Sequence, residues 1–186
     1  MNIVSSENPV KPTKDVRQAW VLGLLVIGLV LMFAFIVLPY VDPGKKVDVK
    51  AHDFTLPIIH GEGAGNALRL SDFSGRVVVL DFWASWCGPC KKQMPILDRV
   101  AKDYADADVT FLGISTDTEP DAALEFLKAS PVSYVSVLDR TGEVSRDFGV
   151  TGLPTLVVID AKGKVIHNDA RLVGERSVRD LIEAAR

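Results

Sequence analysis

The sequence contains little cysteine and little histidine, and neither sign of charge dominates it. Its 186 residues include two cysteines and three histidines, and 21 basic side chains stand against 24 acidic ones. Two cysteines are too few for a small protein held together by several disulfides. A nucleic-acid-binding protein usually carries a basic excess, whereas the net charge here is −3. Both classes are therefore set aside, and no nucleic-acid partner is expected.

Apolar residues are abundant but unevenly distributed. They make up 48% of the chain, which excludes an intrinsically disordered protein. Residues 19–41 carry no charge, and all but three of them, Gly23, Gly28 and Pro39, are apolar. The remainder has the composition of an ordinary soluble domain. The sequence thus predicts one long apolar segment joined to one globular domain.

The apolar segment is long enough to cross a membrane as a single helix. Residues 19–41 would extend about 34 Å in helical form, and the hydrocarbon core of a bilayer is ~30 Å thick. Trp20 and Tyr40 lie near its two ends, where aromatic rings favour the interface. A cleaved signal peptide has a shorter apolar region and a small-residue cleavage site, which Ile36–Tyr40 does not offer. We expect an uncleaved signal anchor, with a buried helix of a soluble protein as the alternative.

The charges that flank this segment do not decide its orientation, because three basic residues lie on each side of it: Lys11, Lys14 and Arg17 before, and Lys45, Lys46 and Lys50 after. The free amino terminus slightly favours a cytoplasmic tail at residues 1–18. A long domain can be exported largely regardless of its charge. Residues 42–52, rich in alternating lysine and aspartate, predict a polar tether, and residues 53–186 form the globular domain.

The globular part shows alternating strand and helix patterns. An almost continuous apolar run at Val77–Phe82 is typical of a strand buried on both faces. A helix is expected from near Cys87 to about Tyr104. Further strands are expected at 109–115, 134–138, 155–160 and 164–167, further helices at 120–129, 142–148 and 176–185, and an added N-terminal β-hairpin at 53–56 and 68–70. This order predicts an α/β fold with a mixed central sheet and helices on both faces.

Both cysteines lie in a Trp-Cys-Gly-Pro-Cys motif between the buried strand and the helix that follows it. Unpaired N–H groups and the helix dipole favour an anion at a helix N-terminus, so the Cys87 thiolate should be stabilised. Cys90 would face into the first helical turn, close enough to Cys87 for a disulfide. Cys87 is therefore predicted to be the attacking sulfur and Cys90 the resolving sulfur of a redox-active pair.

Two other uses of a cysteine pair remain open. A zinc half-site has the same spacing but needs two more ligands, and His52, His60 and His167 are not paired in sequence. An inert disulfide across so short a loop would stabilise the fold little through chain entropy. We expect redox exchange, with no metal and no other cofactor.

Four sequence blocks resemble, in order, the membrane-anchored thiol-disulfide oxidoreductases of the TlpA, ResA and CcmG type in the thioredoxin superfamily: Phe54–Pro57, Leu70–Gly75, Trp86–Cys90 and Gly149–Thr155. The resemblance covers residues 53–186 and implies a thioredoxin-like fold. It implies reduction of disulfides in exported clients, such as apocytochromes c in cytochrome c biogenesis or a copper-site protein of an oxidase. An integral-membrane thiol electron donor would reduce the oxidised cysteine pair again. The chain would be a single-pass protein of the bacterial inner membrane, its domain on the periplasmic or extracytoplasmic side, where disulfides accumulate.

The same resemblance implies roles for residues around the cysteines. Pro154 matches the cis-proline of the family, and Leu153 would present its backbone to an extended client. Trp86, Gly88 and Pro89 complete the expected client-binding surface. The Gly-Pro pair between the cysteines is similar to the reducing members of the family, which favours a reductase over an oxidase.

Asp81 interrupts the apolar strand and is the expected proton carrier. In cytosolic thioredoxins the matching acid helps to deprotonate the resolving cysteine. No lysine occurs in the neighbouring strand at 109–115, so burial should raise the pKa of Asp81 and suit it to proton transfer near neutral pH. An outward-facing, merely structural Asp81 is the alternative. Gln93 stands where many anchored relatives carry glutamate, and it is either part of the site or an ordinary solvated helix residue.

Two other functions stay open. The segment Gly113–Asp117 is similar to a strand end of peroxiredoxins, although the Thr-x-x-Cys context of their peroxidatic cysteine is absent. A non-enzymatic binding module or chaperone could instead use the groove around Pro154. Reduction of insulin by the intact protein, but not by a Cys87→Ser variant, distinguishes the oxidoreductase from the binding module.

Overall fold

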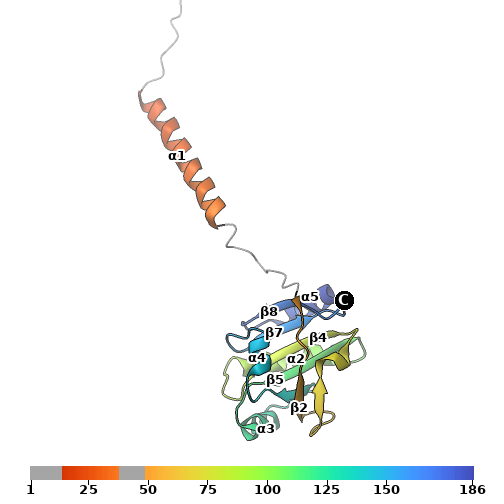
Figure 1. Cartoon of the computed structure of the whole chain (residues 1–186). Coiled ribbons are helices and arrows are strands. Elements are labelled where there is room, and N and C mark those ends of the chain that lie inside the picture. The colour runs from red at the N-terminus through yellow and green to blue at the C-terminus, as the bar shows by residue number, and fades with distance from the viewer. Residues whose placement is uncertain (1–13, 38–48) are drawn as a thin grey trace, which may run out of the picture. The chain divides into compact units, whose positions relative to one another are not determined.

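A computed structural model of the chain describes residues 14–37 and 49–186, which belong to two separate units (Figure 1). The described part of the first unit is a helix, α1 (Lys14–Val37). Among the described residues, no helix combines the length and the apolar character needed to cross a bilayer. Three parts of the predictions lie outside the described residues: 1–13 of the predicted tail (1–18), 38–41 of the apolar segment (19–41) and 42–48 of the predicted tether (42–52).

Over residues 49–186 the chain forms an eight-stranded mixed sheet in the order β1-β8-β7-β4-β5-β6-β2-β3. The strands are β1 (Val49–Lys50), β2 (Thr55–His60), β3 (Ala67–Arg69), β4 (Val77–Trp83), β5 (Val109–Ser115), β6 (Val135–Leu138), β7 (Thr155–Ile159) and β8 (Lys164–Asp169). The helices are α2 (Cys90–Asp103), α3 (Pro120–Ala129), α4 (Glu143–Asp147) and α5 (Glu175–Ala185), with a short 3₁₀ helix, η2 (Leu70–Phe73). The predicted mixed sheet is confirmed.

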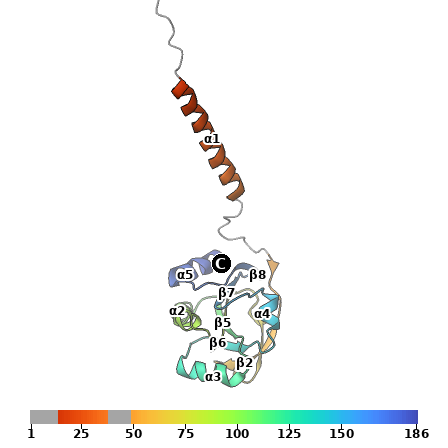
Figure 2. The same ribbon diagram turned by 90° about the vertical axis from the view of Figure 1, so that its left-hand side faces the viewer.

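The two faces of the sheet carry separate hydrophobic clusters. One cluster joins the odd-numbered valines of β4 and Trp83 to α2, α3 and α5, and the other joins Val78, Leu80 and Phe82 to α4 and η2. Figure 2 shows α2 and α5 on one side of the sheet and α4 on the other. All seven residues of β4 are buried, and each large apolar side chain contributes roughly 1.5–3 kcal/mol on burial. The central strand is therefore a rigid base for the loop that leaves its carboxyl end.

The predicted N-terminal hairpin is confirmed at one edge of the sheet. β2 and β3 pair antiparallel, and β2 also pairs with β6. The opposite edge differs from the expectation, because Val49 and Lys50 lie in the predicted tether and yet pair with β8 as β1. Two residues give too short a pattern for a strand to be recognised in sequence.

The predicted start of the helix near Cys87 is wrong, since α2 begins at Cys90 and is preceded by Pro89 as its N-cap. A proline disfavours helical backbone angles in the residue before it, here Gly88. The helix therefore cannot extend back to Cys87. The attacking cysteine lies instead in a loop, residues 84–89, that joins β4 to α2.

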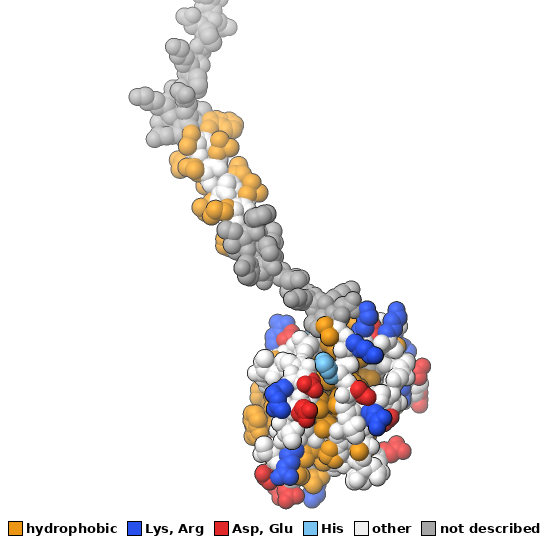
Figure 3. Space-filling view, in the orientation of Figure 1, with side chains coloured by type: hydrophobic (Ala, Val, Ile, Leu, Met, Phe, Trp, Pro, Cys, Tyr) orange, Lys and Arg blue, Asp and Glu red, His pale blue; other side chains and the backbone are white. Residues whose placement is uncertain are grey.

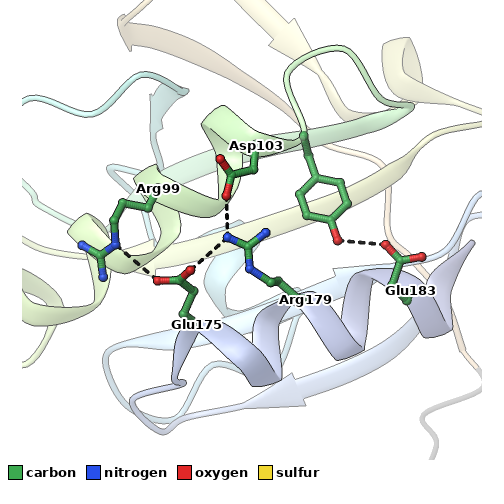
Figure 4. A network of polar contacts seen from close by, with 6 residues as sticks. Arg99, Asp103, Glu175, Arg179 and Glu183 are labelled. Carbon is green, nitrogen blue, oxygen red and sulfur yellow. Dashed lines mark hydrogen bonds and ion pairs between the residues drawn. The ribbon is translucent and has the colours of Figure 1, made fainter.

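Helices α2 and α5 are joined by a network of surface charges (Figure 4). Arg179 of α5 donates to Asp103 of α2 at 2.5 Å and to Glu175 of its own helix at 2.9 Å. Two further contacts reach α5: Arg99 of α2 donates to Glu175, and Tyr104, directly after α2, donates to Glu183. Exposed pairs of this kind contribute little singly. Together they fix α5 beside α2, which carries the resolving cysteine.

The surfaces of the two units differ in character. Figure 3 shows hydrophobic side chains over the described part of α1, whereas basic and acidic side chains are interspersed on the visible face of the second unit. The large hydrophobic residues from Trp20 to Phe33 are each at least 57% exposed. The visible face of the second unit thus carries charges of both signs, as is usual for the surface of a globular domain.

Candidate active site

The two cysteines form a disulfide at the junction of β4 and α2, with 5.3 Å between their Cα atoms. Cys90 is fully buried, while Cys87 keeps 4% of its surface exposed. The pairing predicted from the motif is therefore present. The order of accessibility fits Cys87 as the sulfur that meets another protein.

A backbone donor faces the Cys87 sulfur. The N–H of Cys90 donates to Cys87 Sγ at 3.2 Å, and this N–H belongs to the first turn of α2, whose donors have no helical acceptor. Once the disulfide is reduced, the same group can stabilise a thiolate on Cys87. The helix begins later than expected, but its N-terminus still faces the attacking sulfur.

Asp81 is buried in β4 and points to the side of the sheet that α2 covers. Its Oδ1 accepts a hydrogen bond from Gln93 Nε2 at 3.3 Å, and its Oδ2 accepts one from the Tyr134 hydroxyl at 3.3 Å. Burial raises the pKa of Asp81 from 3.8 to about 7, although both hydrogen bonds act to lower it. The expected rise is confirmed, and the outward-facing alternative is wrong. A group with this pKa can take or give a proton at neutral pH.

Gln93 is fully buried, so the solvated alternative for this residue is wrong. Its Oε1 accepts a hydrogen bond from the backbone N–H of Val173 at 2.9 Å. A backbone N–H can only donate, which fixes the amide with its NH₂ group toward Asp81. Gln93 lies three residues after Cys90 in α2, hence on the same face of the helix. Asp81 therefore lies beneath the helix face that carries the resolving cysteine.

Leu153 and Pro154 lie immediately before β7, next to the end of β4. Their peptide bond is cis, as the resemblance implied, and Pro154 is buried whereas Leu153 is half-buried. Phe82 of β4 is opposite Thr155 of β7 in the antiparallel register. This register brings the cis-proline to the end of β4 from which the cysteine loop departs.

Family models give a direct comparison with known proteins. The model described as Redoxin matches residues 46–181. The chain belongs to the Redoxin family. A thiol-disulfide oxidoreductase ResA of Bacillus thuringiensis subsp. konkukian is 34% identical over 119 residues, which cover 64% of this chain and 67% of the relative. ResA of Bacillus subtilis is 26% identical over 167 residues, covering 90% and 93%.

Solved structures agree with this Redoxin-family assignment. A crystal structure described as a thiol:disulfide interchange protein DsbE from Chlorobium tepidum is 35% identical, covers 76% of this chain and 97% of its own, and gives a TM-score of 0.66. The chain is thus a thiol-disulfide oxidoreductase of the TlpA, ResA and CcmG type with a thioredoxin-like fold.

The remaining predicted site residues of this Redoxin-family protein surround the disulfide. Trp86 is 72% exposed, and Gly88 and Pro89 are exposed as well. Trp83 instead packs in the core against Phe126, with 5.2 Å between ring centroids. An exposed aromatic ring beside a nearly buried disulfide offers a contact surface for another chain. The client-binding roles of these residues stay predictions.

Sequence reasoning missed Tyr134, which lies immediately before β6 and contacts Asp81. Burial, followed by the nearby charge of Asp81, raises the pKa of the Tyr134 hydroxyl well above 10. Tyr134 therefore stays protonated and acts as a hydrogen-bond donor to Asp81. No local pattern in the sequence relates it to Asp81, since 53 residues separate the two.

Proposed function

We propose that this chain is a membrane-tethered reductase that breaks disulfides in exported proteins. Its main support is Asp81, a buried acid with a pKa of about 7 under the helix face that bears Cys90. A dithiol that reduces a client must lose both of its protons, and thiolates rather than thiols attack sulfur. The N-terminus of α2 stabilises the thiolate of Cys87, and Asp81 can accept the proton of Cys90.

The reaction takes place in two exchanges. The Cys87 thiolate attacks one sulfur of the client disulfide, so that a Cys87–client bond forms and the second client sulfur leaves as a thiolate. Cys90 then gives its proton to Asp81 and attacks Cys87 Sγ. The client leaves with both cysteines reduced once its sulfurs bind protons, and the Cys87–Cys90 disulfide remains. Two electrons have passed from this pair to the client.

The partners follow from this balance and from the relatives. Each turnover leaves the pair oxidised, so an integral-membrane thiol protein is proposed to return two electrons. Clients with paired cysteines, such as apocytochromes c or an oxidase copper-site protein, would be substrates in an extracytoplasmic compartment where disulfides accumulate. The Gly88-Pro89 spacer, similar to that of reducing family members, supports this direction.

The proposed membrane anchor is a single transmembrane helix over residues 19–41. Its support is the sequence, in which 23 consecutive residues carry no charge. The intact protein, expressed in a bacterial host, is expected to stay in the membrane pellet after alkaline carbonate extraction. Protease added to spheroplasts should digest the domain. Release by carbonate, or protection from protease in intact spheroplasts, would rule out this topology.

Catalysis can be tested by reduction of insulin with the intact protein in detergent and dithiothreitol as electron source. The wild type is expected to speed precipitation of the insulin B chain well above the uncatalysed rate. Cys87→Ser should return the rate to that of dithiothreitol alone, because the attacking sulfur is lost. Equal rates for both proteins would favour the binding-module alternative.

A further inference from the structure

Asp117 is a second buried carboxylate near the cysteines that the reaction above does not use. It lies two residues after β5 and is 3% exposed. Its Oδ2 accepts the backbone N–H of Ser85 at 2.9 Å, and its Oδ1 accepts the Ser85 hydroxyl at 2.7 Å. The Ser115 hydroxyl donates to Oδ2 at 2.8 Å. Both carboxylate oxygens are therefore engaged, and two of the three donors come from one residue.

A buried carboxylate is costly unless hydrogen bonds replace its water. Bonds to an ionised acceptor are also stronger than those between neutral groups. The pair of bonds from Ser85 therefore holds that residue firmly against the end of β5. The neighbouring bond from the Thr116 N–H to Trp83 O, at 2.9 Å, joins the same two strand ends.

Ser85 is placed where its position decides that of Cys87. It lies in the loop 84–89, two residues before the attacking cysteine, and the N–H of Cys87 donates to Ala84 O at 3.0 Å. The far end of the loop is held by α2 and by the disulfide. Reduction removes the disulfide, and the loop is then held at its near end by the hydrogen bonds at Ala84 and Ser85 and by the packing of Ala84 and Cys87 in the core. The exposed Trp86, Gly88 and Pro89 provide no buried packing in its place.

We propose that Asp117 is a positioning residue for Cys87: its carboxylate clamps Ser85 and so keeps the reduced loop in the geometry in which the Cys90 N–H faces Cys87 Sγ. The strand end Gly113–Asp117, which suggested a peroxidase in the sequence, thereby has a role in dithiol chemistry. The inference rests on Cys87 as the attacking sulfur.

A purely electrostatic role and a clamping role of Asp117 predict opposite shifts of the Cys87 pKa in Asp117→Asn. As a mere nearby negative charge, Asp117 would oppose the thiolate, so its removal would lower the pKa of Cys87 and speed attack. As a clamp, its removal frees the loop, weakens the contact between the Cys90 N–H and the sulfur, and raises the pKa of Cys87. The sign of the shift therefore identifies the mechanism.

The test uses the intact, reduced protein with Ser85→Ala and Asp117→Asn, and with Ser115→Ala as matched control. Ser85→Ala and Ser115→Ala each remove one hydroxyl bond to the same carboxylate, but only Ser85 lies on the cysteine loop. Ser115→Ala also removes the bond that the Ser115 hydroxyl accepts from the Asp117 N–H at 3.2 Å, so it is the more severe of the two changes at Asp117 itself. The first readout is the pH dependence of Cys87 alkylation by iodoacetamide, followed by mass spectrometry. The second is the rate constant for attack of Cys87 on the disulfides of native insulin.

Ser85→Ala and Asp117→Asn are expected to raise the pKa of Cys87 and to slow attack by about tenfold, the effect of one lost hydrogen bond. Ser115→Ala should keep a rate of attack within about twofold of wild type, a smaller change than the loss of one hydrogen bond on the cysteine loop would cause. Wild-type behaviour of Ser85→Ala, equal slowing in Ser115→Ala, or a lowered pKa in Asp117→Asn would overturn the clamp. If Asp117→Asn does not fold, the two serine variants decide. Absence of attack by the wild type would instead refute Cys87 as nucleophile.

Discussion

Asp81→Asn is expected to slow release of the client from the mixed disulfide by about 100-fold at pH 7, the lower end of what a positioned general base provides. Formation of the mixed disulfide should change little, because Cys87 relies on the N-terminus of α2 and not on Asp81. Asparagine has nearly the shape of aspartate but cannot accept the Cys90 proton. Stopped-flow measurement of the two steps with a disulfide-containing peptide separates these effects.

The pH profile provides the control for this result. Because the pKa of Asp81 is about 7, wild-type release should rise with pH up to neutral, as the carboxylate becomes available to accept a proton. In the asparagine variant, release should instead keep rising with pH above neutral, because it then follows the ionisation of the Cys90 thiol alone. Tyr134→Phe keeps the carboxylate and removes one hydrogen bond, so its release should still level off near neutral pH as in the wild type. Equal slowing of both steps in Asp81→Asn would contradict the assigned role.

The same residue is expected to make the folded state less stable as the pH rises. Its pKa is 3.8 in an ordinary setting and about 7 in the fold, so between these values unfolding releases a proton. The free energy of unfolding therefore decreases with rising pH. The contribution of protonated Asp81 is fully present below pH 3.8 and is lost by about pH 7. The change amounts to about 4 kcal/mol at most. A chain that only needed a stable core would gain from a neutral residue here.

Urea unfolding of the oxidised wild type and of Asp81→Asn at pH 4 and pH 8, about the limits of this titration, measures the effect. The variant should be more stable relative to wild type at pH 8 than at pH 4, by up to about 4 kcal/mol. Other groups titrate equally in both proteins and cancel in the comparison. A difference between the two proteins that is the same at both pH values would show that folding does not raise the pKa of Asp81.

Features with strong local rules could be predicted closely from the sequence. The helix Pro120–Ala129 has its predicted bounds because a proline at the first position marks its start. The buried strand at 77–82 follows from an apolar run, and Asp81 stands out within it as a polar interruption. The cis bond at Pro154 was implied by the motif resemblance, whereas the Cys87–Cys90 disulfide followed from the spacing of the two cysteines at the expected start of a helix.

Features that depend on distant contacts could not be predicted in the same way. Gln93 carried a usable signal, since it falls on the buried stripe formed by Cys90, Met94 and Leu97 in α2, yet its polar character suggested solvent. Ser85 and Asp117 carried no such signal, because 32 residues separate them and only the parallel pairing of β4 with β5 brings them together.

The most direct test of the central claim is to trap the mixed disulfide with Cys90→Ser in the intact protein. Without its resolving sulfur, the variant should stay linked through Cys87 to client proteins in the host. These adducts should appear on a non-reducing gel and disappear when the sample is first treated with dithiothreitol. The Cys87→Ser, Cys90→Ser double variant should give none. Absence of such adducts, or equal amounts in the double variant, would contradict exchange through Cys87.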